Sequence, residues 1–276
     1  MTHVAPDTPK PAAAARLRAL TAHLLGTQLV SVLIWGVSLG ALDVLTVLSY
    51  PAFKDSIRQT LSHMSPGARA LFGIQGSGTT IESWLALNTF NLIAPLALAF
   101  YPIIMGSRAV AGREEQRSMD LLLSNPLPRW VLPAATVLTM AAGLLAVLLL
   151  FGFLTWLPAA LVGLHLSAGV TSAAVLNLWP LCLCFGALAL LCSTLVRRSS
   201  LAIAIPGAVV VAMYVAEAIG STSPSVSFLR YLSLFHYYGS AIEHGIPWAS
   251  FLTISLLALL LAGVATLAFY RRDIYA

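Results

Sequence analysis

Long apolar stretches that almost lack charged side chains constrain this chain more than any other feature of its sequence. Six of them are long enough to cross about 30 Å of hydrocarbon as helices of about 20 residues. They are residues 24–48, 84–105, 132–157, 173–196, 201–219 and 251–269. Charged residues make up only 9% of the 276 residues, too few to cover a water-exposed globule. None of the stretches shows the alternating polarity of barrel strands. The sequence therefore predicts an all-α polytopic membrane protein.

The basic residues between the apolar stretches predict the orientation. Lys and Arg accumulate in cytoplasmic segments of membrane proteins. With a cytoplasmic N-terminus, eleven of the 15 basic residues fall in inner segments and four in outer segments. This bias predicts six membrane helices with both termini cytoplasmic. Because the basic residues do not gather on one face, nucleic acid is not expected as a partner.

Segments outside the apolar stretches have distinct compositions. Residues 1–23 are expected to be a cytoplasmic segment with an in-plane amphipathic elbow helix. In this helix Leu17 and Leu20 are at helical spacing, and Arg16 precedes them. Such a helix lies among the headgroups of membrane lipid. Residues 24–276 then form one membrane domain, with outer-face segments at 49–83 and 220–250. The second outer segment is rich in aromatic residues, which suits an interfacial belt or a lid.

The inner loop, residues 106–131, has a mixed charged and apolar character. Good helix formers and early acidic residues favour a short helix, and Asn125–Pro126 ends it. Two interpretations are open, a docking surface for a partner or a solvated amphipathic loop. The candidate contact residues are Arg113, Glu114, Glu115, Arg117, Asp120, Leu121, Leu122, Asn125, Pro126 and Arg129.

Three segments resemble motifs of the ATP-binding-cassette (ABC) type-2 export permeases. Residues 107–129 resemble the family's signature after the second membrane helix, with an acidic pair, a leucine triplet and a Pro-x-x-Arg turn. Residues 231–238 are similar to its aromatic motif before the last helix, and 269–273 to its usual ending. The sequence departs from the family at Ser118–Met119, where Gly-Thr is common.

The resemblance implies the transmembrane permease subunit of an ABC exporter in the bacterial plasma membrane. Such a subunit is not an enzyme, and this sequence has no Gly-x-x-x-x-Gly-Lys-Ser/Thr phosphate loop. The implied partners are a separate ABC ATP-binding subunit, which would hold ATP and Mg, and a second permease subunit. No cofactor or metal is expected on this chain. The inner loop would be the coupling helix that contacts the ATPase, and the elbow helix a second contact.

Four polar residues within or at the edge of the apolar stretches are candidates for the translocation path. Asp43 and Glu217 are carboxylates, which are costly inside a bilayer, and Asn88 and Asn91 are three residues apart. The alternative interpretation is structural, with hydrogen-bonded carboxylates near helix ends and asparagines that bond neighbouring helices.

Two glycines in the first apolar stretch are candidates for a dimer seam. Gly36 and Gly40 form a Gly-x-x-x-Gly pattern, which permits close approach of two helices.

Two other function classes compete with the ABC permease. An ion-gradient-driven secondary transporter would show inverted repeats, and none is visible between residues 1–131 and 132–276. An intramembrane enzyme would need a catalytic constellation, and the chain has no His-Glu-x-x-His motif.

Overall fold

A computed structural model describes residues 13–63, 80–115, 130–196, 198–222 and 224–271. These residues contain helices and connections but no strand, and six helices are long and apolar enough to cross a membrane. The predicted all-α class with six spanning helices is confirmed. Five of the six are α1 (Ala13–His63), α7 (Val131–Leu161), α8 (Ala168–Leu195), α9 (Ser199–Thr222) and α12 (Trp248–Arg271). The sixth runs over Ile93–Glu115 and begins with α4 (Ile93–Ser107).

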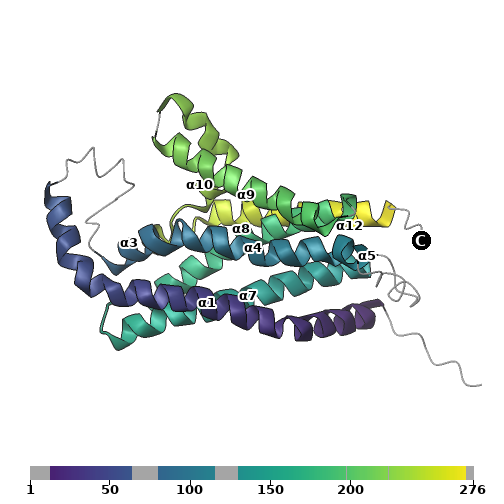
Figure 1. Cartoon of the computed structure of the whole chain (residues 1–276), viewed down its shortest axis with the longest axis horizontal. Coiled ribbons are helices and arrows are strands. Elements are labelled where there is room, and N and C mark those ends of the chain that lie inside the picture. The colour runs from purple at the N-terminus through teal and green to yellow at the C-terminus, as the bar shows by residue number, and fades with distance from the viewer. Residues whose placement is uncertain (1–12, 64–79, 116–129, 197, 223, 272–276) are drawn as a thin grey trace, which may run out of the picture.

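The long helices run along a common axis (Figure 1). Helix α1 packs on α7, whereas α4, α7 and α12 all pack on α8, which is the most buried span of the bundle. The start of α1 and the end of α12 lie at the same end of the bundle as α5 (Arg113–Glu115) (Figure 1). An even number of crossings requires this arrangement. We call this end the α5 end.

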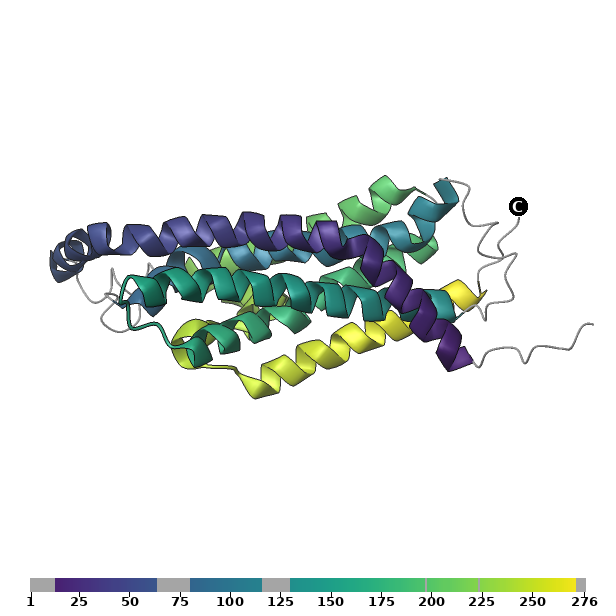
Figure 2. The ribbon, with the colours of Figure 1, turned by 90° about the horizontal axis from the view of Figure 1, so that it is seen from below.

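Helix α1 is longer than the apolar stretch from which it was predicted. It is continuous over 51 residues, so it includes both the predicted elbow and the start of the outer segment 49–83. Its first turns run at an angle to the rest of the helix (Figure 2). Arg16, Leu17 and Leu20 belong to this N-terminal part of α1 rather than to a separate helix. Its last turns bend away from the bundle (Figure 1), and Pro51 lies within the helix.

The second predicted span is interrupted. In place of one helix over 84–105 there are α3 (Ile81–Leu85), the π-helix η1 (Ala86–Phe90) and then α4. Leu92 has non-helical dihedral angles, φ −128° and ψ −70°. Pro95 explains the position of the break, because its ring would collide with the carbonyl of Asn91 four residues earlier.

Glycines bring α4 and α8 into close contact. A Cβ atom added to Gly106 would lie 2.5 Å from the carbonyl oxygen of Gly186, and one added to Gly186 would lie 2.6 Å from Cβ of Pro102. Membrane helices associate through such close packing, since lipid provides no hydrophobic driving force between them. The α4–α8 contact therefore depends on the absence of side chains at these positions.

Short helices occupy the outer segment between α9 and α12. These are the 3₁₀-helix η3 (Pro224–Leu232), α10 (Leu234–Tyr238) and α11 (Ala241–His244). The end of α9 and η3 form a hairpin that projects from the side of the bundle (Figure 1). The aromatic residues of this segment are divided between two environments. Phe235 and Tyr238 are buried, while Tyr231 and Trp248 are exposed.

The α4–α8 contact predicts a difference between two glycines. Gly106→Ala should destabilise the protein by about 1–3 kcal/mol, because the new methyl group meets backbone that cannot move aside. Gly263→Ala, in α12, meets nothing within 4 Å and should leave stability unchanged or slightly raised. Thermal unfolding in detergent measures both. Equal melting temperatures for the two variants would contradict this account of the packing.

Candidate functional site

The inner loop leaves the bundle through an irregular stretch that α8 stabilises. After α4 the chain forms the π-helix η2 (Arg108–Gly112) and then α5. The buried hydroxyl of Ser193 in α8 accepts hydrogen bonds from the backbone N–H groups of Val110 (3.1 Å) and Ala111 (3.0 Å). It donates one to the carbonyl of Ser107 at 2.8 Å. The start of the loop is therefore fixed to the central helix.

Glu115 fixes the same segment to the start of α9. Its Oε1 accepts a hydrogen bond from the backbone N–H of Ser199 at 2.8 Å, and its Oε2 accepts one from the Ser199 hydroxyl at 2.5 Å. A carboxylate at a helix N-terminus satisfies an N–H group that has no partner within the helix, and it complements the positive end of the helix dipole. Glu115, predicted as a contact with the ATPase, is thus engaged with α9 of its own chain.

The remaining candidate contact residues of the inner loop fall into two groups. Arg113 and Glu114 are half-buried on α5 beside Glu115. The others lie outside the described residues, and they are Arg117, Asp120, Leu121, Leu122, Asn125, Pro126 and Arg129.

Asp43 lies in a polar cluster between three helical segments. Its carboxyl group is fully buried. The hydroxyl of Thr89, in η1, donates a hydrogen bond to Oδ1 at 2.6 Å, and that of Thr155, in α7, contacts Oδ2. Because a buried acid without partners is very costly, these two hydroxyls account for its presence inside the bundle.

The two asparagines lie next to this cluster along the chain but do not join it. The side-chain amide of Asn88 donates to the Trp84 carbonyl of its own helical turn at 2.9 Å. Asn91 is exposed at the end of η1. Their neighbour Thr89, and not either asparagine, contacts Asp43.

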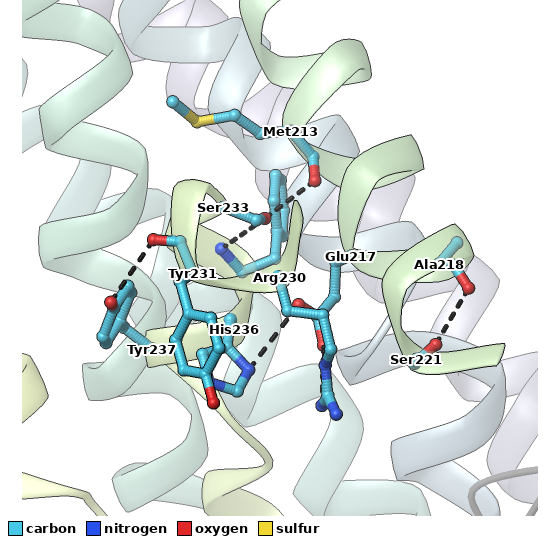
Figure 3. A network of polar contacts seen from close by, with 10 residues as sticks. Met213, Glu217, Ala218, Ser221, Arg230, Tyr231, Ser233, His236 and Tyr237 are labelled. Atoms are coloured by element: carbon cyan, nitrogen blue, oxygen red, sulfur yellow. Dashed lines mark hydrogen bonds and ion pairs between the residues drawn. The ribbon is translucent and has the colours of Figure 1, made fainter. Parts of the chain in front are cut away.

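Glu217 belongs to a separate network in the α9–η3 hairpin (Figure 3). Arg230 of η3 forms an ion pair with it, with Nη2 at 3.0 Å from Oε1 and Nε at 3.1 Å. Nδ1 of His236 lies 3.6 Å from Oε2, beyond hydrogen-bond distance. Ser233 closes the hairpin, because its hydroxyl donates to the Met213 carbonyl at 2.7 Å. Glu217 thus holds η3 against α9 and shares no partner with Asp43.

The predicted glycine pair is used within the chain. Gly36 and Gly40 are buried, and Cβ atoms added to them would lie 2.7 Å from Leu150 and 2.3 Å from Leu154 of α7. In this arrangement they bring α1 against α7 and are not available as a dimer seam. The same run also reads Gly-x-Ser-x-Gly, but Ser38 lies inside a helix and not on the strand-to-helix turn of a hydrolase.

A second link crosses the bundle near the break before α4. The hydroxyl of Tyr238 donates to the Phe90 carbonyl at 3.2 Å, and the side chain of Asn177 in α8 donates to the Tyr238 carbonyl at 2.9 Å. Tyr238 therefore joins η1, α8 and α10.

Several of these residues were not predicted as site residues. They are Thr89, Thr155, Asn177, Ser193, Ser199, Arg230 and Tyr238. The signal that could have indicated most of them is a polar side chain within or at the end of an apolar stretch. Their partners could not have been read from spacing, because the contacts of Ser193 and Thr155 with α4 and α1 span more than 80 residues.

The fold and these polar links define a multi-pass α-helical membrane protein in which the start of the inner loop, residues 107–115, is fixed to α8 and α9. The family described as "ABC-2 family transporter protein" matches residues 38–274. The chain belongs to this family and is a membrane component of an ABC transporter. Membership implies association with an ABC ATP-binding subunit. A comparison with curated proteins found no match.

The Asp43 cluster predicts a loss of stability when the hydroxyl group of Thr89 is replaced by a methyl group. Thr89→Val preserves side-chain shape but leaves Oδ1 of Asp43 without its donor, and should cost about 1–3 kcal/mol of stability. Thr46→Val is the control, since the hydroxyl of half-buried Thr46 bonds only to the Leu42 carbonyl of its own helix, and the backbone carbonyl that Trp84 contacts is unchanged by the substitution. Thermal unfolding and the yield of monodisperse protein in detergent measure both variants. A Thr89→Val protein as stable as Thr46→Val would contradict a structural role for the cluster.

Proposed function

We propose that this chain is the permease subunit of an ABC exporter in the bacterial plasma membrane, moved by a separate ATPase subunit. The α5 end faces the cytoplasm in this proposal, with both termini, and the segment 113–129 contacts the ATPase. ATP and Mg bind to that partner. A second permease subunit, identical or different, completes the transport path.

The observation that carries the proposal is the double attachment of the loop that would receive the ATPase. Ser193 ties η2 to α8, and Glu115 ties α5 to the start of α9. A loop that only joined two membrane helices would need neither contact. Because helices are stiff, a push on 113–129 would be transmitted to α4, α8 and α9 together.

The transport step in this proposal is a rigid tilt of helices, driven by ATP binding and hydrolysis on the ATPase subunits. Closure of two ATPase subunits would displace the two loops and exchange an inward opening for an outward one. The α4–α8 contact through Gly106 and Gly186 supports the concerted movement, since close-packed helices move as one body. The energy is supplied by ATP hydrolysis outside this chain.

One observation favours the competing function of an ion-gradient-driven transporter. Asp43 is a buried carboxyl group, and such groups carry protons in some secondary transporters. ATP dependence of transport in proteoliposomes separates the two functions. The two hydroxyl partners of Asp43 give it a sufficient structural role, so the ABC permease remains the better supported function.

Charge reversal in the inner loop should weaken binding of the ATPase. Asp120→Arg is expected to reduce co-purification with a co-expressed ABC ATPase subunit about tenfold or more, because rim charges set the register of docked surfaces. Glu243→Arg is the matched control, because its helix α11 packs against α3, η1 and α8. Undiminished co-purification of the Asp120→Arg protein would oppose the docking assignment.

The Glu115–Ser199 contact should matter for coupling rather than for docking. Glu115→Ala and Ser199→Ala are each expected to lower permease-stimulated ATP hydrolysis about threefold, and the double variant should lower it no further. Ser200→Ala, the exposed neighbour, should leave stimulation unchanged. Co-purification should persist in every variant. Additive losses in the double variant would show that the two residues do not act through one contact.

A further inference from the structure

A cavity of about 290 Å³ opens between α1, α4 and α7 at the α5 end. Its walls come from the first half of α1, from α4 with η2 and α5, and from the start of α7. Two features account for the open space. The first turns of α1 run at an angle to the rest of the helix (Figure 2), and Ala109 and Gly112 of η2, which line the cavity, have a methyl side chain and no side chain, respectively.

The charged residues described around the cavity are all basic. Arg108 and Arg113 line it, and none of the described residues that line it is acidic. No described carboxylate forms an ion pair with Arg108, whose side chain is exposed. Two guanidinium groups facing one cavity favour an anion such as a phosphate or a carboxylate.

The polar groups of the cavity include a donor without a partner. The hydroxyl of Tyr101 is buried and has no hydrogen-bond partner among the described residues, and Tyr101 lines the cavity at 2% exposure. Buried donors are almost always satisfied, so this one points to a ligand or to water. Thr27, Thr136 and Thr139 each donate to a carbonyl of their own helix, which leaves their oxygens able to accept from hydroxyl groups.

Apolar side chains complete the wall. Leu24, Trp35, Ile104 and Met105 line the same space as the arginines, and Trp35 stands edge-to-face with Tyr101 at 6.4 Å. The volume lies at the lower limit of about 300–1,000 Å³ for small-molecule sites. It fits a headgroup with the first carbons of a chain and excludes a whole lipid.

We propose that this cavity is the entry site for an amphipathic anion taken from the cytoplasmic leaflet, with a phosphate or carboxylate beside hydroxyl groups in its headgroup. That the bound molecule is then exported rests on the proposed function; that it binds does not. Arg108 and Arg113 hold the anionic group, Tyr101 donates to it, the threonines accept from the hydroxyls, and the apolar wall receives the chain.

Binding to the purified permease in detergent tests the site without any ATPase. The probes are dioctanoyl phosphatidylglycerol, dioctanoyl phosphatidylcholine and inorganic phosphate, and the readout is ligand retention in native mass spectrometry. The glycerol lipid should bind at least about tenfold more tightly than the choline lipid. Equal binding of the two lipids, or inorganic phosphate binding as tightly as the glycerol lipid, would overturn the assignment of an amphipathic anion.

Three variants locate the binding. Arg108→Gln should weaken binding of the glycerol lipid about fivefold to tenfold, and Thr27→Trp, which fills the cavity from an exposed position on α1, should abolish it. Arg271→Gln is the matched control, an exposed arginine at the same end that does not line the cavity. Unchanged binding in both Arg108→Gln and Thr27→Trp would overturn the proposal.

The proposed function can fail independently of this site. If no ABC ATPase associates with the permease but the glycerol lipid still binds in an Arg108-dependent way, the anion site is supported and ATPase-driven export is contradicted. If the ATPase associates and is stimulated but the lipid does not bind, export by an ABC transporter is supported and the anion site is contradicted.

Discussion

The constraint on which this structure depends is that a membrane offers no water to unpaired backbone groups. The second span is irregular at both ends, with η1 before Pro95 and η2 after α4. Each irregularity leaves polar backbone atoms that other helices satisfy. Tyr238 donates to the Phe90 carbonyl. The hydroxyl of Ser193 accepts from the N–H groups of Val110 and Ala111 and donates to the Ser107 carbonyl. These contacts connect segments far apart in the chain, so satisfying the backbone also fixes distant parts of the sequence to one another.

Charged residues at the edges of the bundle also connect neighbouring segments. Glu115 pairs with the N-terminus of α9, and Glu217 pairs with Arg230 across the α9–η3 hairpin. Helix α9 is thereby held by a carboxylate at each end, one from the inner loop and one of its own. Under the proposed function, a helix fixed at both ends would be suited to transmit a displacement from one side of the membrane to the other. Asp43, with its two threonines, plays the corresponding role where α1, η1 and α7 meet.

The sequence predicted the spans well and the site only partly. Spans three to six begin and end within a few residues of the observed helices, because hydropathy is a local property that does not depend on how helices pack. The first span was predicted too short, since polar turns beyond its apolar stretch remain helical. The break in the second span followed from Pro95, a signal present in the sequence but hidden within an apolar stretch. The Gly36–Gly40 pattern correctly indicated close approach of helices but not which helix would approach.

What the sequence alone determined is the number of membrane helices, their approximate limits and the family, because each rests on composition or on short motifs in register. Tertiary structure alone decided which polar groups meet. The contacts of Asp43 with Thr155, of Ser193 with η2 and of Glu115 with Ser199 each depend on the rotation of one helix against another. Close packing fixes that rotation, and no local pattern encodes it. The cavity between α1, α4 and α7 is decided in the same way, since its arginines and its tyrosine face one space only once the three helices are in place.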